Sequence, residues 1–450
     1  MKWRPRFAWF ALLIVAWAPG ARAAGTPADS ARVSELERKV DVLTSEIERI
    51  KLGETGAAPV ESPGAGKSLG PSVSKVYRSR PGVSFGGYGE LLLNTFERHR
   101  QDGEISGTRN QVNLLRAVIY AGYKFNDQLL LNSELEWESG GVLDQAGTTV
   151  DSTGSGSTRL SGEGTVEFAY LDWAPHRELG VRAGKLLVPV GITNEMHEPP
   201  VLIGAMRPDV ETRIIPTTWS AAGVGVFGAL SNGLSYRAYL IEGLDGAGFT
   251  AATAIRGGRQ NASQAMATRP GGVLRIDYDG LSMVTFGASY YAGHSWQRDQ
   301  PPGMHLDPIA RISEIHARYQ QRGLEARALY ANGTLSQAVE LSNQLGLVGA
   351  ERLGKAFFGG YVEAAYDVMP EIAAGSSIAL LPYVRYDESD TQDLVEMPGI
   401  DDPEHHWTAL SIGLALKPVT GIAVKGERQQ RRTEAHTATS QWNLSLGWMF

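Results

Sequence analysis

The last ten residues of the chain, Gln441-Trp442-Asn443-Leu444-Ser445-Leu446-Gly447-Trp448-Met449-Phe450, alternate for most of their length between polar or small and large apolar side chains. Successive side chains of an extended strand point to opposite faces, so the tryptophans, the leucines and the terminal phenylalanine share one face. The segment is therefore predicted to be a β-strand with one apolar and one polar face. In a soluble sandwich the polar face would point outward, whereas in a membrane barrel it would line the lumen.

The same period of two recurs from Val83 onward and predicts sixteen strands. We expect them at residues 84–96, 110–125, 128–138, 163–174, 179–185, 221–230, 233–242, 271–279, 281–293, 311–320, 323–332, 355–367, 376–387, 406–417, 421–428 and 439–450. Eight long loops interleave with tight turns, which we place at Asn126-Asp127, Pro175 to Glu178, Ser231-Asn232, Gly280, Gln321-Arg322, Met369-Pro370 and Pro418 to Thr420. This sorting is typical of outer-membrane barrels. The predicted fold class is all-β, a 16-stranded antiparallel transmembrane β-barrel over residues 83–450.

The composition excludes several other classes of protein. The 450 residues include no cysteine, so neither a disulfide scaffold nor a thiolate metal site is available. The only long apolar run, Phe7 to Ala18, is too short for a bundle of transmembrane helices. A formal net charge of −7 argues against nucleic acid as a partner. A mean hydropathy of −0.18 suits a barrel, because half of every strand faces water in the lumen.

The N-terminus is predicted to be a secretory signal peptide, residues 1–23. Basic residues precede the apolar run, and the small-x-small pattern Ala21-Arg22-Ala23 follows it, so we expect cleavage after Ala23. Removal of four basic residues and no acidic residue would take the formal charge from −7 to −11. The mature protein is thus expected to cross the inner membrane.

Residues 30–52 are predicted to form a coiled-coil stem in the periplasm. Apolar residues recur with spacings of three and four, at Val33, Leu36, Val40, Leu43, Ile47 and Ile50. Such a seam favours self-association, and a trimer is allowed. The alternative is an amphipathic helix packed on its own domain. The stretch 53–82, rich in Gly, Pro and Ser, argues against that alternative and is predicted to be a flexible linker.

Four segments of the predicted barrel share features with a known family of proteins: Phe85-Gly86-Gly87-Tyr88-Gly89-Glu90, Val166 to Asp172, Gly184 to Gly191 with Asn194-Glu195, and Ile215-Pro216-Thr217-Thr218-Trp219. They resemble the phosphate-selective porin O and P family of Gram-negative bacteria. The similarity covers about residues 83–450, and such porins also occur with a coiled-coil extension. The resemblance implies a trimeric channel whose third external loop folds inward. The strand ending at Phe450 is similar to the signal read by the barrel-assembly machinery.

The third long connection, residues 186–220, is the longest and is the candidate pore constriction. We expect its charged and polar residues to narrow the lumen: Lys185 at its edge, Glu195, His197, Glu198, Arg207, Glu211 and Arg213. Opposed charges there would orient polar solutes. The alternative is a rim loop that never enters the lumen.

The strand pattern also predicts residues that line the pore, among them Arg116, Glu134, Arg318, Arg327 and Arg385. Both signs of charge occur in this set, and the loop itself carries four acids against two arginines. Selection of phosphate would favour clustered Lys and Arg instead. The charges therefore favour a general diffusion pore with a mild preference for cations.

We thus predict an outer-membrane porin that lets small hydrophilic solutes or ions diffuse passively. One alternative is an anion-selective or phosphate-selective channel. Another is an outer-membrane enzyme, for which Ser313, His294 and His316 are the imaginable residues, or a tether that contacts the cell wall through the stem. No catalytic motif, cofactor fingerprint or metal site is expected, because His197-Glu198 and His405-His406 lack a spaced third ligand. Membrane lipid and identical subunits are the expected partners.

Overall fold

The computed structural model describes residues 69–140, 162–300, 303, 305–373 and 375–450. All of them belong to one compact unit, Val60–Phe450. The predicted signal peptide (1–23) and coiled-coil stem (30–52), and the predicted linker as far as residue 68, lie outside the described residues. These predictions therefore stay predictions.

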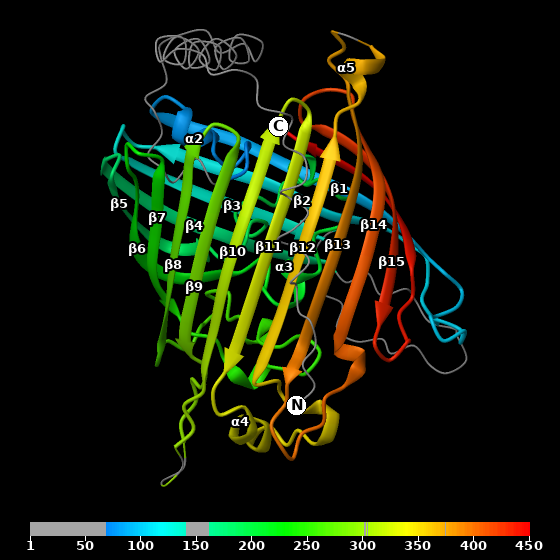
Figure 1. The fold of residues 1–450 in the computed structure, drawn as a ribbon. Coiled ribbons are helices and arrows are strands. Elements are labelled where there is room, and N and C mark those ends of the chain that lie inside the picture. The colour runs from blue at the N-terminus through cyan, green and yellow to red at the C-terminus, as the bar shows by residue number, and fades with distance from the viewer. Residues whose placement is uncertain (1–68, 141–161, 301–302, 304, 374) are drawn as a thin grey trace, which may run out of the picture. The chain divides into compact units, whose positions relative to one another are not determined.

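Sixteen strands of the described chain form a closed antiparallel barrel (Figure 1). They are β1 (Gly82–Phe96), β2 (Gln111–Lys124), β3 (Leu129–Glu138), β4 (Glu163–His176), β5 (Leu179–Leu187), β6 (Ser220–Ala229), β7 (Leu234–Glu242), β8 (Pro270–Leu281), β9 (Val284–His294), β10 (Ile309–Gln321), β11 (Leu324–Leu335), β12 (Ala356–Tyr366), β13 (Ala379–Leu394), β14 (His406–Lys417), β15 (Ile422–Thr433) and β16 (Gln441–Met449). Each strand pairs with its neighbours in sequence, and β1 pairs with β16. The predicted fold class is confirmed.

The connections separate into two ends of the barrel. Short turns such as Arg322-Gly323 lie at one end, which we call the short-turn end, and loops such as 188–219 leave the other, which we call the long-loop end. Figure 1 shows the short-turn end at the top, with α5 (Met369–Ile372) and the C-terminus. The tight turn predicted at Met369-Pro370 is wrong, since residues 367–378 form a longer connection around α5. A proline in the first turn of a helix favours this outcome.

The barrel is apolar outside and polar inside. On β16 the side chain of Trp442 is 59% exposed, whereas that of its neighbour Asn443 is 3% exposed. On β14, Ile412 is exposed and Ser411 is fully buried. A soluble sheet would show the opposite arrangement, because water would solvate its outer face. The polar face of each alternating strand therefore lines the interior of the barrel.

Glycines close the seam between the first and last strands. A Cβ atom on Gly89 would lie 2.2 Å from the ring of Trp448, its register partner on β16. A Cβ on Gly87 would lie 2.8 Å from the ring of Phe450. The backbone N–H of Gly87 donates to the Phe450 carbonyl at 3.0 Å, and the Phe450 N–H donates to the Gly87 carbonyl at 2.9 Å. The absence of a side chain at Gly87 and at Gly89 thus makes room for the rings of Phe450 and Trp448.

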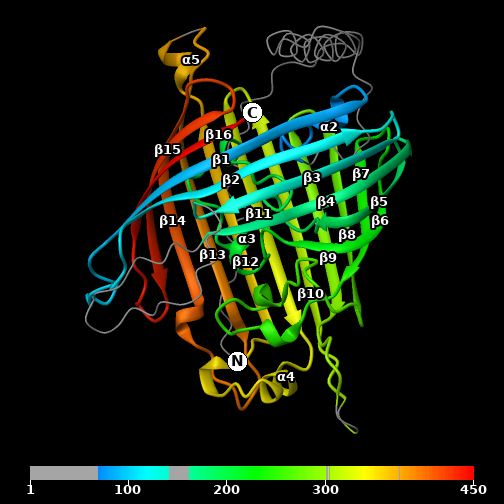
Figure 2. The same cartoon turned by 180° about the vertical axis from the view of Figure 1, so that it is seen from behind.

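Residues 69–81 fold against the inside of the barrel. They include the single helical turn α2 (Lys75–Arg78), which contacts β1, β2 and β3 (Figure 2). Leu69, Val73, Val76 and Tyr77 are buried in the main apolar cluster. The flexible linker predicted over 53–82 is therefore wrong in this part. Its Gly, Pro and Ser content concealed four apolar residues that bury themselves against the wall.

The remaining helices lie in the long loops. They are α3 (Val210–Arg213) and the 3-10 turn η2 (Pro199–Val201) in loop 188–219, the 3-10 turns η3 (Gly246–Gly248) and η4 (Arg256–Gly258), α4 (Ala338–Gln344) with η5 (Gly349–Glu351), and η6 (Pro403–His405). Among the described residues no helix is long and apolar enough to cross a membrane.

Candidate functional site

The loop between β5 and β6, residues 188–219, lies inside the barrel. Its His197 contacts Glu134 of β3, and its Pro199 carbonyl accepts a hydrogen bond from Lys425 of β15. Further contacts reach inward-facing residues of six other strands: Arg237 (β7), Arg275 (β8), Arg318 (β10), Arg327 (β11), Tyr361 (β12) and Arg385 (β13). A loop confined to the rim would not contact inward-facing residues on so many strands.

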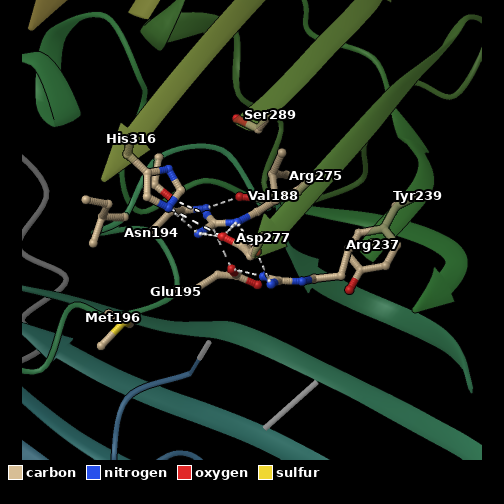
Figure 3. A network of polar contacts seen from close by, with 12 residues as sticks. Val188, Asn194, Glu195, Met196, Arg237, Tyr239, Arg275, Asp277, Ser289 and His316 are labelled. Carbon is tan, nitrogen blue, oxygen red and sulfur yellow. Dashed lines mark hydrogen bonds and ion pairs between the residues drawn. The ribbon is translucent and has the colours of Figure 1, made fainter. Parts of the chain in front are cut away.

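A buried charge network attaches the loop to β7 and β8 (Figure 3). The guanidinium of Arg237 donates to Glu195 of the loop and, at 2.6 Å, to Asp277. Arg275 contacts Asp277 at 2.9 Å and lies 3.5 Å from Glu195. The four side chains are nearly inaccessible to water, so each charge depends on the others for compensation. Glu195, one of the predicted constriction residues, anchors the loop to the wall.

His316 extends this network toward β10. Its Nδ1 lies 2.7 Å from Oε1 of Glu314, and its Nε2 lies 3.1 Å from a nitrogen of Arg275 (Figure 3). The residues imagined for an enzyme are not assembled here, because Ser313 is on the exposed face of β10. His294 contacts Asp307, near the long-loop end.

Glu211 braces the loop internally. Its carboxylate accepts hydrogen bonds from the backbone N–H groups of Ile192 and Thr193, at 2.8 and 2.5 Å, and from the Thr193 hydroxyl at 2.8 Å. The hydroxyl of Tyr361 on β12 donates to the same carboxylate at 3.0 Å. Glu211 is fully buried. Its carboxylate oxygens are occupied by the loop backbone and the wall, so Glu211 holds the shape of the loop, and its place in a pore constriction stays a prediction.

His197 and Glu198 secure the part of the loop nearest residues 69–81. His197 Nε2 lies 3.2 Å from Glu134, and burial lowers the pKa of His197 to about 4, so its ring is neutral at pH 7. The Glu198 carboxylate accepts the backbone N–H groups of Ser72 and Val73, each at 2.9 Å. Both predicted residues thus make contacts within the protein.

The other predicted constriction residues have different surroundings. The guanidinium of Arg213 stacks over the ring of Trp407, 4.1 Å from its centroid. Two nitrogens of Arg207, Nε and Nη2, are buried without a hydrogen-bond partner among the described residues. Lys185 is half-buried on β5 and pairs in register with Ala169 and Ala222. Among the predicted constriction residues, Arg207 is the one with buried nitrogens that lack a hydrogen-bond partner in the described part of the chain.

The predicted lining residues all project inward, and their pairing varies. Arg385 contacts Asp387 at 2.7 Å, whereas Arg116 lies 3.6 Å from Glu136, beyond normal hydrogen-bond length. Nε and Nη1 of Arg116 and both carboxylate oxygens of Glu136 are buried without hydrogen-bond partners among the described residues. Arg116 and Glu136 are thus buried and only loosely paired, whereas Arg385 has a close carboxylate partner.

A cavity of about 510 Å³ opens at the short-turn end between the loop and strands β8 to β11. Arg318 and Arg327, which are direct register partners on β10 and β11, both line it. Nε of Arg318 is buried without a hydrogen-bond partner in the described part of the chain. The other charged lining residues are Asp279, Glu325 and Lys417. No group of three or more His, Asp or Glu side chains in the described ranges could hold a metal ion.

Sequence reasoning missed two sets of contacts. The first is the ammonium group of Lys425, which donates to three loop carbonyls: Pro199 at 2.7 Å, Leu202 at 2.5 Å and Gly204 at 3.0 Å. Alternation alone places Lys425 inside, but backbone acceptors carry no sequence signal. The second is the segment 69–81. The feature of the sequence that could have indicated its packing is the group of four apolar residues that are buried there, Leu69, Val73, Val76 and Tyr77.

The chain is related in sequence to a known protein. No family model matches it. An uncharacterised protein of Aquifex aeolicus (strain VF5) is 31% identical over 390 residues, which is 85% of this chain and 83% of that protein. The chain belongs to the family of that protein. The shared sequence extends well beyond any single segment of the barrel.

Solved structures with some likeness to this one are outer-membrane barrels. OmpT of Vibrio cholerae in its trimer form has a TM-score of 0.49 and 12% identity, over 83% of this chain and 100% of that chain. OmpF of Salmonella typhi in complex with daunomycin has a TM-score of 0.49 and 13% identity, over 82% and 97%. The channel DcaP of Acinetobacter baumannii has a TM-score of 0.48 and 12% identity, over 82% and 97%. Likeness at this level carries no argument about the pore.

Proposed function

We propose that this protein is an outer-membrane porin through which small hydrophilic solutes or ions diffuse passively. The observation that carries the proposal is the inverted polarity of the closed barrel, with exposed leucines, isoleucines and tryptophans outside and buried charged side chains inside. Lipid would solvate the first surface and water the second. The short-turn end would face the periplasm, as is usual for such barrels.

In this proposal loop 188–219 narrows the pore, and Arg207 is the residue of the predicted set best placed to meet solute. Arg207 is partly exposed and two of its nitrogens have no partner among the described residues, whereas Glu195, Glu198 and Glu211 are occupied by contacts within the protein. Reversing its charge with Arg207→Glu should shift the reversal potential toward cations. Arg432→Glu, on the exposed face of β15, is the control and should leave it unchanged. An unchanged potential in Arg207→Glu would place the loop outside the conduction path.

Anion preference is a second candidate, which the cavity favours. Arg318, Arg327 and Lys417 line it against Asp279 and Glu325. Two arginines in direct register repel each other, and an anion between them would relieve that cost. The loop itself carries more acidic than basic residues, which favours cations instead. The ratio of permeabilities for potassium and chloride distinguishes the two preferences, and the ratio for chloride and phosphate then tests selectivity for phosphate.

The same proposal includes assembly. Residues 1–23 would direct export, residues 30–52 would form a periplasmic stem that supports a homotrimer or touches the cell wall, and the strand ending at Phe450 would engage the barrel-assembly machinery. Deletion of 33–50 should weaken trimers on gel filtration without unfolding the barrel. If the trimers were unaltered after this deletion, the stem would not support assembly, and its role as a tether to the cell wall would be the remaining explanation.

The decisive experiment is conductance of the purified full-length mature protein in planar bilayers. Stepwise channels in KCl are expected. Properly folded protein that inserts into bilayers without conducting would end the porin proposal and leave the enzyme and tether alternatives.

A further inference from the structure

Residues 69–81 are built into one side of the short-turn mouth. The hydroxyl of Tyr77 donates to Asp172 at 2.7 Å and accepts from Arg182 at 2.8 Å. The side-chain amide of Asn132 donates to the Val73 carbonyl at 3.2 Å. These partners project inward from β3, β4 and β5. The segment therefore covers the inner wall there with matched polar and apolar contacts.

Close packing leaves little free space beneath the segment, where the cavity beside Tyr77 and Leu130 measures only about 20 Å³. A Cβ atom on Gly122 of β2 would lie 2.7 Å from the side chain of Val76. Asn132 is 1% exposed, and Tyr77 is 3% exposed. Lys124, at the end of β2, donates to the Ser79 carbonyl at 3.1 Å. The wall from β1 to β5 is thus closed to solute at this end of the barrel.

The segment is also joined to the inward loop and to the seam of the barrel. Glu198 of the loop accepts two backbone N–H groups of the segment, those of Ser72 and Val73. The hydroxyl of Ser72 contacts the Phe450 carbonyl and accepts from the N–H of Gly87 at 3.0 Å. One side chain of the loop therefore fixes the segment from within the barrel, and β1 and the C-terminal residue fix it at the wall.

The opposite half of the mouth is open. The 510 Å³ cavity lies there, between the loop residues Met196, Pro200 and Val201 and the ends of β8 to β11. Thr285 of β9 lines this cavity beside its register partner Arg318. The same end of the barrel is thus filled along β1 to β5 and hollow along β8 to β11.

We infer that residues 69–81 act as a fixed half-plug, and that solute passes the short-turn end only through the cavity between β8 and β11. The inference rests on the proposed pore function. Glu198 is the positioning residue that keeps the half-plug closed. Arg318, Arg327 and Thr285 are then the groups that each solute passes at this end.

Thiol labelling tests this inference on a clean background, because the full-length chain contains no cysteine. Thr285→Cys places a thiol in the cavity, and Asn132→Cys places one under the half-plug. A negatively charged, water-soluble thiosulfonate should react readily with Thr285→Cys and lower its single-channel conductance. It should react with Asn132→Cys about 100-fold more slowly, because labelling there requires local opening. Leu130→Cys, also buried beside the segment, is a second probe should Asn132→Cys fail to fold.

Release of the half-plug gives the matched comparison. Adding Glu198→Ala to Asn132→Cys should raise its labelling rate at least tenfold, whereas adding Glu104→Ala, an exposed site in a long loop, should not. Equal labelling of Thr285→Cys and Asn132→Cys in the parent background would overturn the inference. So would a conductance block from Asn132→Cys and none from Thr285→Cys. Labelling rates remain readable in a protein that does not conduct, so failure of the pore proposal is distinguished from failure of the half-plug.

Discussion

Two pairs of arginines occupy equivalent positions in the barrel and have different surroundings. Arg237 and Arg275 are direct register partners on β7 and β8, and Arg318 and Arg327 are direct register partners on β10 and β11. Glu195 and Asp277 bridge the first pair. The second pair lines the cavity, and its nearest ion-pair partner among the described residues is Glu363 of β12, which lies outside the cavity lining and 3.7 Å from Arg327.

The difference shows that an inward arginine has no single role. Like charges directly opposite each other in a sheet cost about 0.2–1 kcal/mol. The protein offsets this cost at Arg237 and Arg275 with a carboxylate delivered by the loop, and the pair becomes a loop anchor. At Arg318 and Arg327 the loop delivers only the sulfur of Met196 and the carbonyl of Val201. That pair remains available to a solute.

The largest expected effect is loss of the anchor in Glu195→Gln. Breaking a buried ion pair leaves charge uncompensated, so we expect the docked loop to lose about 3 kcal/mol of stability. Backbone amides of residues 188–219 should exchange hydrogen correspondingly faster. Glu325→Gln, in the cavity, is the control and should change exchange little. Unaltered exchange in Glu195→Gln would show that the carboxylate does not hold the loop.

A change at the second pair should act on ions rather than on stability. A unit charge a few ångströms from a permeating ion contributes about 1 kcal/mol in water. Arg318→Glu changes the charge by two units, so the cation-to-anion permeability ratio should rise by at least about tenfold. The reversal potential in a KCl gradient measures it. The same ratio in parent and variant would mean that ions do not pass Arg318.

Arg327→Lys separates charge from hydrogen bonding at this pair. The variant keeps the positive charge and removes the bond from the Arg327 guanidinium to the Val201 carbonyl, which is 2.6 Å long. We expect ion preference to stay within about twofold of the parent and loop docking to weaken by about 1 kcal/mol. Reversal potential and hydrogen exchange report the two quantities independently. A large change in ion preference would show that selectivity depends on the shape of the guanidinium group and not on its charge alone.

The smallest effect is expected from Met196→Leu. The two side chains have similar volume, and a thioether is a weak acceptor, so loop stability should change by less than about 1 kcal/mol. Hydrogen exchange of the loop should match the parent. A loss comparable to that of Glu195→Gln would make the contact between Met196 and Arg318 a second anchor.

The strands were the most predictable part of the molecule. Period-two alternation located all sixteen to within a few residues in most cases, because each strand has one face in lipid and one in the lumen. The helical connection at 367–378 and the folded segment 69–81 were not predicted. In both places a few residues gain their stability from neighbours distant in sequence, and composition records nothing of those neighbours.

The site was predictable only as a set of inward-facing charges. Glu195, Glu198 and Glu211 have the same chemistry in the sequence, yet they bind arginines of two strands, the backbone of residues 72–73, and the backbone of residues 192–193 respectively. Each partner lies on a different segment. A carboxylate that faces solute and one that fastens a loop cannot be separated by residue type.

By itself, the sequence determined the closed barrel, its inverted polarity and the inward row of charges, because these follow from a repeat of two residues that every strand carries locally. Only the tertiary structure decided which charged side chains hold loop 188–219 to the wall, which half of the short-turn end is filled, and where the cavity lies. Those outcomes depend on pairing between segments up to hundreds of residues apart, such as Ser72 with Phe450, and the energy of a buried charge is fixed by the partner that reaches it.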